Sequence, residues 1–177
     1  MGDFKLVNND ICEIKRLDTP IDNQTIQKLR IGDKIEIFGV ILTGRDAALP
    51  RLVKSIKNGQ DIIDLKGSVI MHTAVSEAGI SPTTSNKVEI EESIPYLAKS
   101  GVKIHLGKGA LGKDTVRALD KYFSIYAVTP PAAALLTSKI VSKKVVAFEE
   151  EGMEAIYSLE VQGLPCIVAA AHGETIY

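Results

Sequence analysis

The hydrophobic pattern early in the chain predicts a strand followed by a helix. Residues 34–42 begin with alternating polar and apolar positions and become continuously apolar, which is typical of a strand entering a buried sheet. After a polar break at residues 43–46, apolar residues recur at helical spacing: Leu49, Leu52, Val53 and Ile56. Asp46 is a candidate N-cap for this helix, and the Asn-Gly pair at residues 58–59 is expected to end it.

Strand and helix patterns alternate through the rest of the chain. Further strands are expected at residues 68–71, 102–106 and 124–128, and helices near residues 94–98, 116–122 and 132–137. Residues 72–87 are rich in Ser, Thr, Gly and Pro and predict no regular structure. From Lys144 onward the pattern indicates short strands, with residues 163–165 between two of them. Without a linker or repeat, residues 1–177 are predicted to form a single layered domain of the α/β or α+β class.

The composition excludes several classes of protein. The 177 residues are 45% hydrophobic and 24% charged, as in ordinary globular proteins, and the net charge is −1. Interspersed charges of both signs argue against nucleic acid or an anionic membrane as a partner. No apolar run approaches the roughly 20 residues that span a bilayer, and the N-terminus lacks a signal-peptide pattern. We therefore expect a cytoplasmic protein.

Cysteine and histidine residues offer little for metal binding. Cys12 and Cys166 are the two cysteines, they are far apart, and free thiols in apolar surroundings are the expected state. An iron–sulfur cluster needs three or four thiolates, so this chain is not expected to hold one alone. The histidines, His72, His105 and His172, show no metal-ligand spacing, and no metal ligand is predicted.

Three loops follow a predicted strand and lead towards a predicted helix, at residues 43–46, 81–87 and 107–109. In open α/β sheets this edge is where ligands bind. The loops carry three cations, Arg45, Lys87 and Lys108, which together would suit a dicarboxylate. Each loop also has a purely structural interpretation: an Arg45–Asp46 ion pair with a helix cap, a solvated loop at residues 83–85, and a strand-to-helix turn at residues 107–109.

Residues 107–113 have the G-x-x-x-x-G-K spacing of a phosphate-binding P-loop. That motif continues with Ser or Thr, which reaches Mg²⁺, whereas Asp114 follows here. Its carboxylate would also repel a phosphate, so nucleotide binding is not predicted.

Five short motifs occur in one order along the chain. They read LTGRDAA at residues 42–48, DLKG at 64–67, SPTTS at 81–85, GKG at 107–109 and EGMEAI at 151–156. In this order the chain resembles the C-terminal domain of class I, iron–sulfur-dependent fumarate hydratases, and the β subunits of two-subunit fumarate hydratases and L(+)-tartrate dehydratases. The resemblance extends from about Asp18 to the C-terminus and implies a swivelling β/β/α layered fold.

The resemblance implies a function that needs a second chain. It implies the β subunit of a hydro-lyase that interconverts fumarate and (S)-malate, a step of the tricarboxylic acid cycle. The partner α subunit would carry a [4Fe–4S] cluster. An L(+)-tartrate dehydratase β subunit shares every motif and stays open as an alternative, as does a non-catalytic module that binds small anions.

The resemblance also assigns roles to individual residues. The catalytic residues would be Thr83, similar to a family threonine proposed to take part in proton transfer, and Lys108, similar to a lysine that contacts substrate. Substrate-binding residues would be Arg45, Asp46, Thr84, Lys87, Gly107 and Gly109. Lys87 stands where the family usually has Arg and lacks its two-pronged donor geometry, and Leu49 replaces a frequent His.

Overall fold

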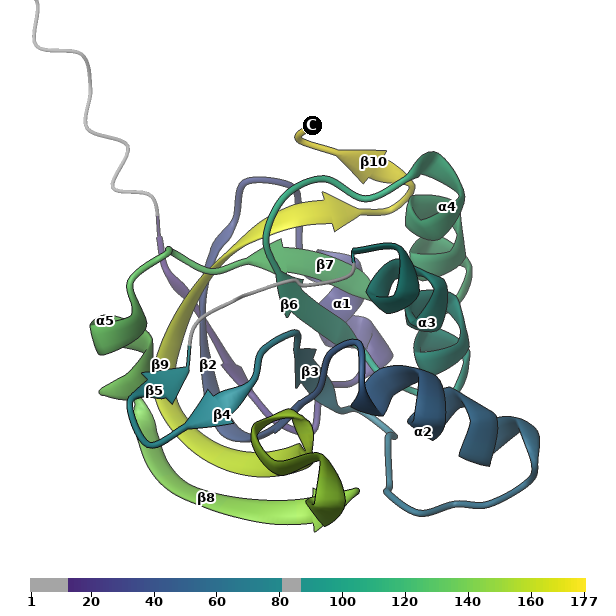
Figure 1. Ribbon diagram of the computed structural model, residues 1–177. Helices are drawn as coiled ribbons and strands as arrows, with labels where there is room; N and C mark the ends of the chain where they lie inside the picture. The colour runs from purple at the N-terminus through teal and green to yellow at the C-terminus, as the bar shows by residue number, and fades with distance from the viewer. Residues whose placement is uncertain (1–12, 81–86) are drawn as a thin grey trace, which may run out of the picture.

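A closed barrel of five strands forms the centre of the molecule in the computed structural model, which describes residues 13–80 and 87–177 (Figure 1). Four neighbouring strands are parallel: β2 (Lys34–Thr43), β3 (Val69–Met71), β6 (Ile104–Gly107) and β7 (Ile125–Val128). The long strand β9 (Ile156–Ala171) is antiparallel to both β7 and β2 and thereby closes the ring. Closure leaves these five strands without a free edge between them.

Alternate side chains of the barrel strands fill its interior. Ile35, Ile37 and Ile41 of β2 are almost fully buried and pack with residues of the other strands: Val69, Met71, Ile104, Leu106, Leu159, Val161 and Leu164. β9 reaches around the barrel because its pairing with β2 shifts register between Ile37 and Phe38, and such a bulge bends a strand. The prediction of a break at residues 163–165 was therefore wrong, since these residues lie inside β9.

Shorter strands extend the sheet at its margins. β1 (Lys15–Asp18) pairs with β2, whereas β8 (Ile140–Ala147) and β10 (Glu174–Thr175) pair with β9. A separate two-stranded hairpin is formed by β4 (Val75–Ser76) and β5 (Gly79–Ile80). The prediction of no regular structure in residues 72–87 was thus wrong in part.

Helices α2 (Ala48–Lys57), α3 (Lys87–Lys99) and α4 (Lys113–Lys121) lie side by side along one side of the barrel, on the right of Figure 1. Their apolar faces are buried in two further clusters between helices and sheet. Two short helices, α1 (Asn23–Lys28) and α5 (Ala133–Thr137), and a 3₁₀ segment, η1 (Glu149–Glu154), complete the fold. No helix in the described part of the chain is long and apolar enough to cross a membrane.

The helix predicted after β2 is present, but its start differs from the prediction. Ala47, not Asp46, occupies the N-cap position and makes no side-chain cap hydrogen bond. α3 is longer than the apolar pattern indicates and continues through Pro95. Burial of Ile94 and Leu97 on either side of the proline offsets the cost of about 3 kcal/mol for a proline inside a helix. The predicted mixed α/β class is confirmed, whereas the swivelling β/β/α layered arrangement stays a prediction.

Candidate functional site

The loops after β2, β3 and β6 leave the barrel at the same end. These strands are parallel neighbours, and Thr43 pairs with Met71, which pairs with Leu106. The N–H of Gly44 also donates to the Met71 carbonyl at 3.1 Å, which joins the first two loops directly. The barrel therefore places the loops that bear Arg45 and Lys108 at one end, separated by a single strand.

Arg45 is held by a carboxylate from a distant part of the chain. Its Nε donates to Oε1 of Glu154 at 2.7 Å, and its Nη2 contacts the same oxygen. Both side chains are partly buried, with 18% of Arg45 and 22% of Glu154 exposed. Asp46 lies farther away, with 3.6 Å between its Oδ1 and Nε of Arg45. The predicted Arg45–Asp46 pair is thus present, but Glu154 is the closer carboxylate.

Glu154 is a residue to which the sequence assigned no role. It belongs to the EGMEAI motif and lies in η1, just before β9. Its second oxygen, Oε2, accepts the N–H of Ala47 at 3.3 Å, at the start of α2. In the sequence, the EGMEAI motif was the one feature that pointed to Glu154. Its contacts could not be predicted from neighbouring residues, because its partners, Arg45 and Ala47, lie more than 100 residues earlier.

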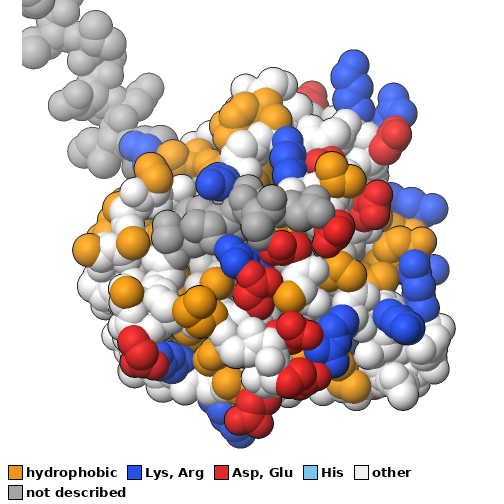
Figure 2. All heavy atoms as spheres, in the orientation of Figure 1, with side chains coloured by type: hydrophobic (Ala, Val, Ile, Leu, Met, Phe, Trp, Pro, Cys, Tyr) orange, Lys and Arg blue, Asp and Glu red, His pale blue; other side chains and the backbone are white. Residues whose placement is uncertain are grey.

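The rest of η1 is docked on α2 by a second arginine. Arg51 pairs with Glu150 at 2.6 Å and with Glu151, and its guanidinium lies 4.3 Å above the ring of Phe148. Figure 2 shows acidic and basic side chains interspersed over the face that α2 and η1 share. Two arginines thus fix η1 against the helix and against the loop after β2.

Glycine occupies residues 107 and 109 for different structural reasons. A Cβ atom at Gly107 would lie 2.6 Å from the Tyr126 hydroxyl and 3.2 Å from Nδ1 of His72, so no larger residue fits without movement. Gly109 has a φ of +75° with open space around it, and therefore serves the turn itself. Lys108 lies between them and is exposed. The close approach at Gly107 is therefore to the protein's own side chains.

The N-terminus of α4 is capped by a carboxylate from α3. Oε1 of Glu91 accepts the N–H of Gly112 at 2.5 Å and the hydroxyl of Thr115 at 2.9 Å. In a P-loop this region would bind a phosphate, but here a fixed negative charge takes its place. The geometry agrees with the exclusion of nucleotide binding.

Two buried histidines lie beneath the loop of Lys108. The ring centroids of His72 and His105 are 5.6 Å apart, and 2% and 0% of these residues are exposed. Among the described residues, Nε2 of His72 and both ring nitrogens of His105 have no hydrogen-bond partner. Burial lowers the pKa of His72 to about 4, and burial together with the neighbouring His72 also lowers the pKa of His105. Both rings are therefore neutral at pH 7.

A groove of about 760 Å³ lies between α2 and α3 and reaches Asp46. Its charged lining consists of three carboxylates, Asp46, Glu89 and Glu92, and two lysines, Lys54 and Lys57, and it includes neither Arg45 nor Lys108. These charges sum to −1, and the cations predicted to bind a substrate lie elsewhere, so we place the candidate site at the loops and not in this groove.

The structure describes the positions of only some of the predicted site residues. Thr83 and Thr84 lie outside the described residues. Lys87 is the first residue of α3 and is exposed. The site roles assigned to these residues, and to Arg45, Asp46, Gly107, Lys108 and Gly109, stay predictions.

Within residues 13–80 and 87–177, no three His, Cys, Asp or Glu side chains gather closely enough to hold a metal ion. Cys166 is buried with a free thiol, and burial raises the pKa of that thiol, whereas Cys12 lies outside the described residues. The described residues therefore do not fit a cluster bound by this chain.

Comparison with known proteins identifies the family. A family model described as Fumarase C-terminus matches residues 5–177. The L(+)-tartrate dehydratase subunit beta of Escherichia coli K12 is 31% identical, over 92% of this chain and 86% of its own length. A Methanocaldococcus jannaschii protein provisionally given the same name is 30% identical, over 89% of this chain and 88% of its own. A Geobacillus stearothermophilus protein, provisionally named a class I fumarate hydratase, is 30% identical over 91% of this chain but only 33% of its own length. The chain therefore belongs to the fumarase C-terminus family.

Proposed function

We propose that this chain is the β subunit of a two-subunit hydro-lyase that interconverts fumarate and (S)-malate. The observation that carries the proposal is the position of Arg45, a partly buried and ordered cation at the end of the barrel where the loop of Lys108 also emerges. The names of the relatives, a class I fumarate hydratase and L(+)-tartrate dehydratase β subunits, support the reaction class.

In this proposal the chain binds the substrate and moves a proton. Arg45 and Lys87 would bind substrate carboxylates, with Asp46, Thr84 and the glycines 107 and 109 shaping the loops around them. Lys108 would contact the substrate next to Thr83, which would exchange the proton on the carbon beside a carboxylate. The hydroxyl group is added to or removed from the neighbouring carbon.

The remaining chemistry is assigned to the partner. The family implies a [4Fe–4S] cluster, which we assign to the α subunit and which would supply Lewis-acid chemistry when bound. A swivelling movement of this domain against the α subunit would close the shared site and exclude water. We place the assembled enzyme in the cytoplasm.

An L(+)-tartrate dehydratase is the second candidate, because two of the relatives above carry that name. Tartrate has one more hydroxyl group than malate. The two substrates therefore share the carboxylate contacts assigned to Arg45 and Lys87.

Anaerobic co-expression with a cluster-bearing α subunit tests the proposal, with assays on malate, fumarate and tartrate. We expect hydro-lyase activity from the complex, and no iron and no activity from this chain alone. The preferred substrate distinguishes the first candidate from the second. Dicarboxylate binding by this chain alone, with no activity on mixing, would instead indicate a non-catalytic anion-binding module.

A further inference from the structure

Glu154 contacts both the side chain of Arg45 and the main chain at Ala47, just before α2. One carboxylate oxygen bonds to the guanidinium of Arg45, and the other accepts the N–H of Ala47. We propose that Glu154 is the positioning residue of the site, orienting Arg45 towards the carboxylate of a dicarboxylic substrate. This inference rests on the proposed function.

The segment that carries Glu154 is anchored on both sides. On one side, Arg51 of α2 binds Glu150 and Glu151. On the other, the N–H of Tyr157 donates to the buried hydroxyl of Thr43 at 3.2 Å, at the end of β2. The Tyr157 hydroxyl donates to the Gly152 carbonyl at 3.1 Å, which ties η1 to β9. Glu154 therefore has little freedom to follow a moving arginine, and the arginine is fixed by it.

The geometry favours orientation over simple charge neutralisation. Oε1 of Glu154 binds the edge of the guanidinium formed by Nε and Nη2. An arginine side chain loses rotamer entropy when it is fixed. Because Glu154 already fixes Arg45 in the free protein, substrate binding does not bear that cost.

Charge sets a limit on this arrangement. Glu154 and Asp46 both lie near the single positive charge of Arg45, so these three side chains sum to −1. A dianionic substrate then depends on further cations, which Lys87, Lys108 and the partner subunit can supply. Arg45 would orient the substrate carboxylate, while the net electrostatic attraction for the substrate would come from these other cations.

The test is kinetic and uses the assembled complex. Glu154→Gln removes the charge but keeps an amide oxygen for the N–H of Ala47. The matched control is Glu151→Gln, in the same segment, because Arg51 keeps its ion pair with Glu150 and η1 stays anchored. We expect Glu154→Gln to raise KM for the dicarboxylate about tenfold with kcat within about threefold, because a carboxylate contact acts equally on the ground and transition states. Glu151→Gln should change both constants less than about twofold.

A double-mutant cycle shows whether Glu154 acts through Arg45. In an Arg45→Met background, Glu154→Gln should add less than about twofold, since the group it positions is gone. Full additivity would overturn the proposal. A lower KM in Glu154→Gln would also overturn it, because it would mean that Glu154 competes with the substrate for Arg45.

A spectroscopic readout separates this inference from the proposed function. In the chain alone, the Nε–H proton of Arg45 should exchange slowly with water in the wild type and in Glu151→Gln, and at least tenfold faster in Glu154→Gln. Equal exchange in all three would overturn the positioning role. Absence of hydro-lyase activity in the wild-type complex would overturn the proposed function, while the exchange result would still decide whether Glu154 fixes Arg45.

Discussion

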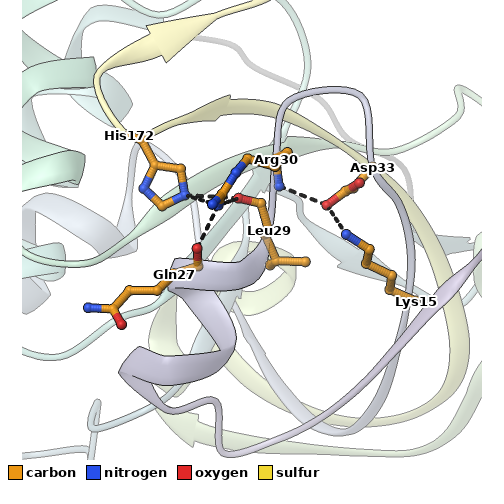
Figure 3. Close-up of polar contacts among 6 residues, drawn as sticks. All are labelled: Lys15, Gln27, Leu29, Arg30, Asp33 and His172. Atoms are coloured by element: carbon orange, nitrogen blue, oxygen red, sulfur yellow. Dashed lines mark hydrogen bonds and ion pairs between the residues drawn. The ribbon is translucent and has the colours of Figure 1, made fainter.

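Arg30 and Arg45 lie just before and just after β2, at opposite ends of the barrel, and their partners differ in kind. Nη1 of Arg30 donates to the main-chain carbonyls of Gln27 at 2.5 Å and Leu29 at 2.9 Å, at the end of α1 (Figure 3). It also lies 3.2 Å from Nε2 of His172, which is 2.8 Å from the same Leu29 carbonyl. Arg45 instead binds a side-chain carboxylate.

The main chain around Arg30 is fixed by a second contact. The N–H of Arg30 donates to Oδ2 of Asp33 at 2.7 Å, and the same oxygen accepts from Nζ of Lys15 at 2.6 Å (Figure 3). These contacts join α1, β1 and the turn before β2. Arg30 therefore stabilises a helix end and a turn, whereas Arg45 pairs with a carboxylate, the same kind of group that a dicarboxylate ligand would present. The kind of partner, a main-chain carbonyl or a carboxylate, is the observation that distinguishes the two arginines.

The two arginines should separate activity from stability. In the assembled enzyme, Arg45→Met should lower kcat/KM between about 10²-fold and 10³-fold, because it removes a carboxylate contact and leaves Glu154 unpaired. Arg30→Met should leave kcat/KM within about twofold but lower the melting temperature. Steady-state kinetics and thermal unfolding measure both. Equal losses of activity would mean that the two ends are not functionally distinct.

The buried histidines at the Lys108 end should make stability depend on pH. Since burial lowers the pKa of His72 from an ordinary value of 6.5 to about 4, the unfolded chain binds a proton before the folded chain does. This part of the stability is complete above pH 6.5 and is lost progressively as the pH falls to about 4. At about 1.4 kcal/mol per pKa unit, the loss is roughly 3 kcal/mol.

Urea unfolding between pH 7 and pH 4 measures this dependence. A His72→Leu, His105→Leu double variant should lose less stability over that interval than the wild type. A His172→Leu variant is the control from the opposite end. If the double variant follows the wild-type curve, the histidines are not the groups that titrate.

Lys108 and Lys113 both lie in the P-loop-like segment, residues 107–113. Comparing their variants tests whether Lys108 belongs to the active site. Lys108→Met should lower kcat by about 10²-fold, the usual size of a lost acid–base contribution. Thr83→Val should give a similar loss, and the double variant should be little worse than either alone. Lys113→Met, at the exposed start of α4, should be within about twofold of wild type. Full activity of Lys108→Met would remove its loop from the site.

The smallest expected effect is that of alanine substitutions at Gly109 and Gly173, which lie at the two ends of the barrel. Gly109 and Gly173 have φ values of +75° and +78° and space for a Cβ atom. Alanine at either position should therefore cost about 1 kcal/mol of unfolding free energy, from the left-handed backbone alone. Only Gly109→Ala should also lower kcat/KM, by a few-fold. Equal activity of the two variants would show that the backbone at residue 109 does not contribute to the site.

Local sequence patterns predicted much of the fold. The alternation in residues 34–42 and the helical spacing that follows correspond to β2 and α2, and Asn58 and Gly59 end that helix. Side-chain burial with a fixed period is a property of consecutive residues, so it can be recognised in the sequence. β1 and α1 escaped prediction because four and six residues give too few positions to establish a period.

Contacts between distant segments could not be predicted in this way. The sequence suggested Asp46 as the helix cap and as the partner of Arg45. In the structure, Glu154, 109 residues away from Arg45, accepts the N–H of Ala47 and is the closer carboxylate to the guanidinium. Likewise, the carboxylate that caps α4 comes from Glu91 of α3.

The sequence by itself determined the family, the alternation of strands and helices, and the three cationic loops. Only the tertiary structure decided that β9 closes a barrel and that Arg45 is held by Glu154 while Arg30 caps a helix. The reason is physical: a hydrophobic period reports which face of a segment is buried. The partner of a charged group depends on which segments the closed sheet brings together.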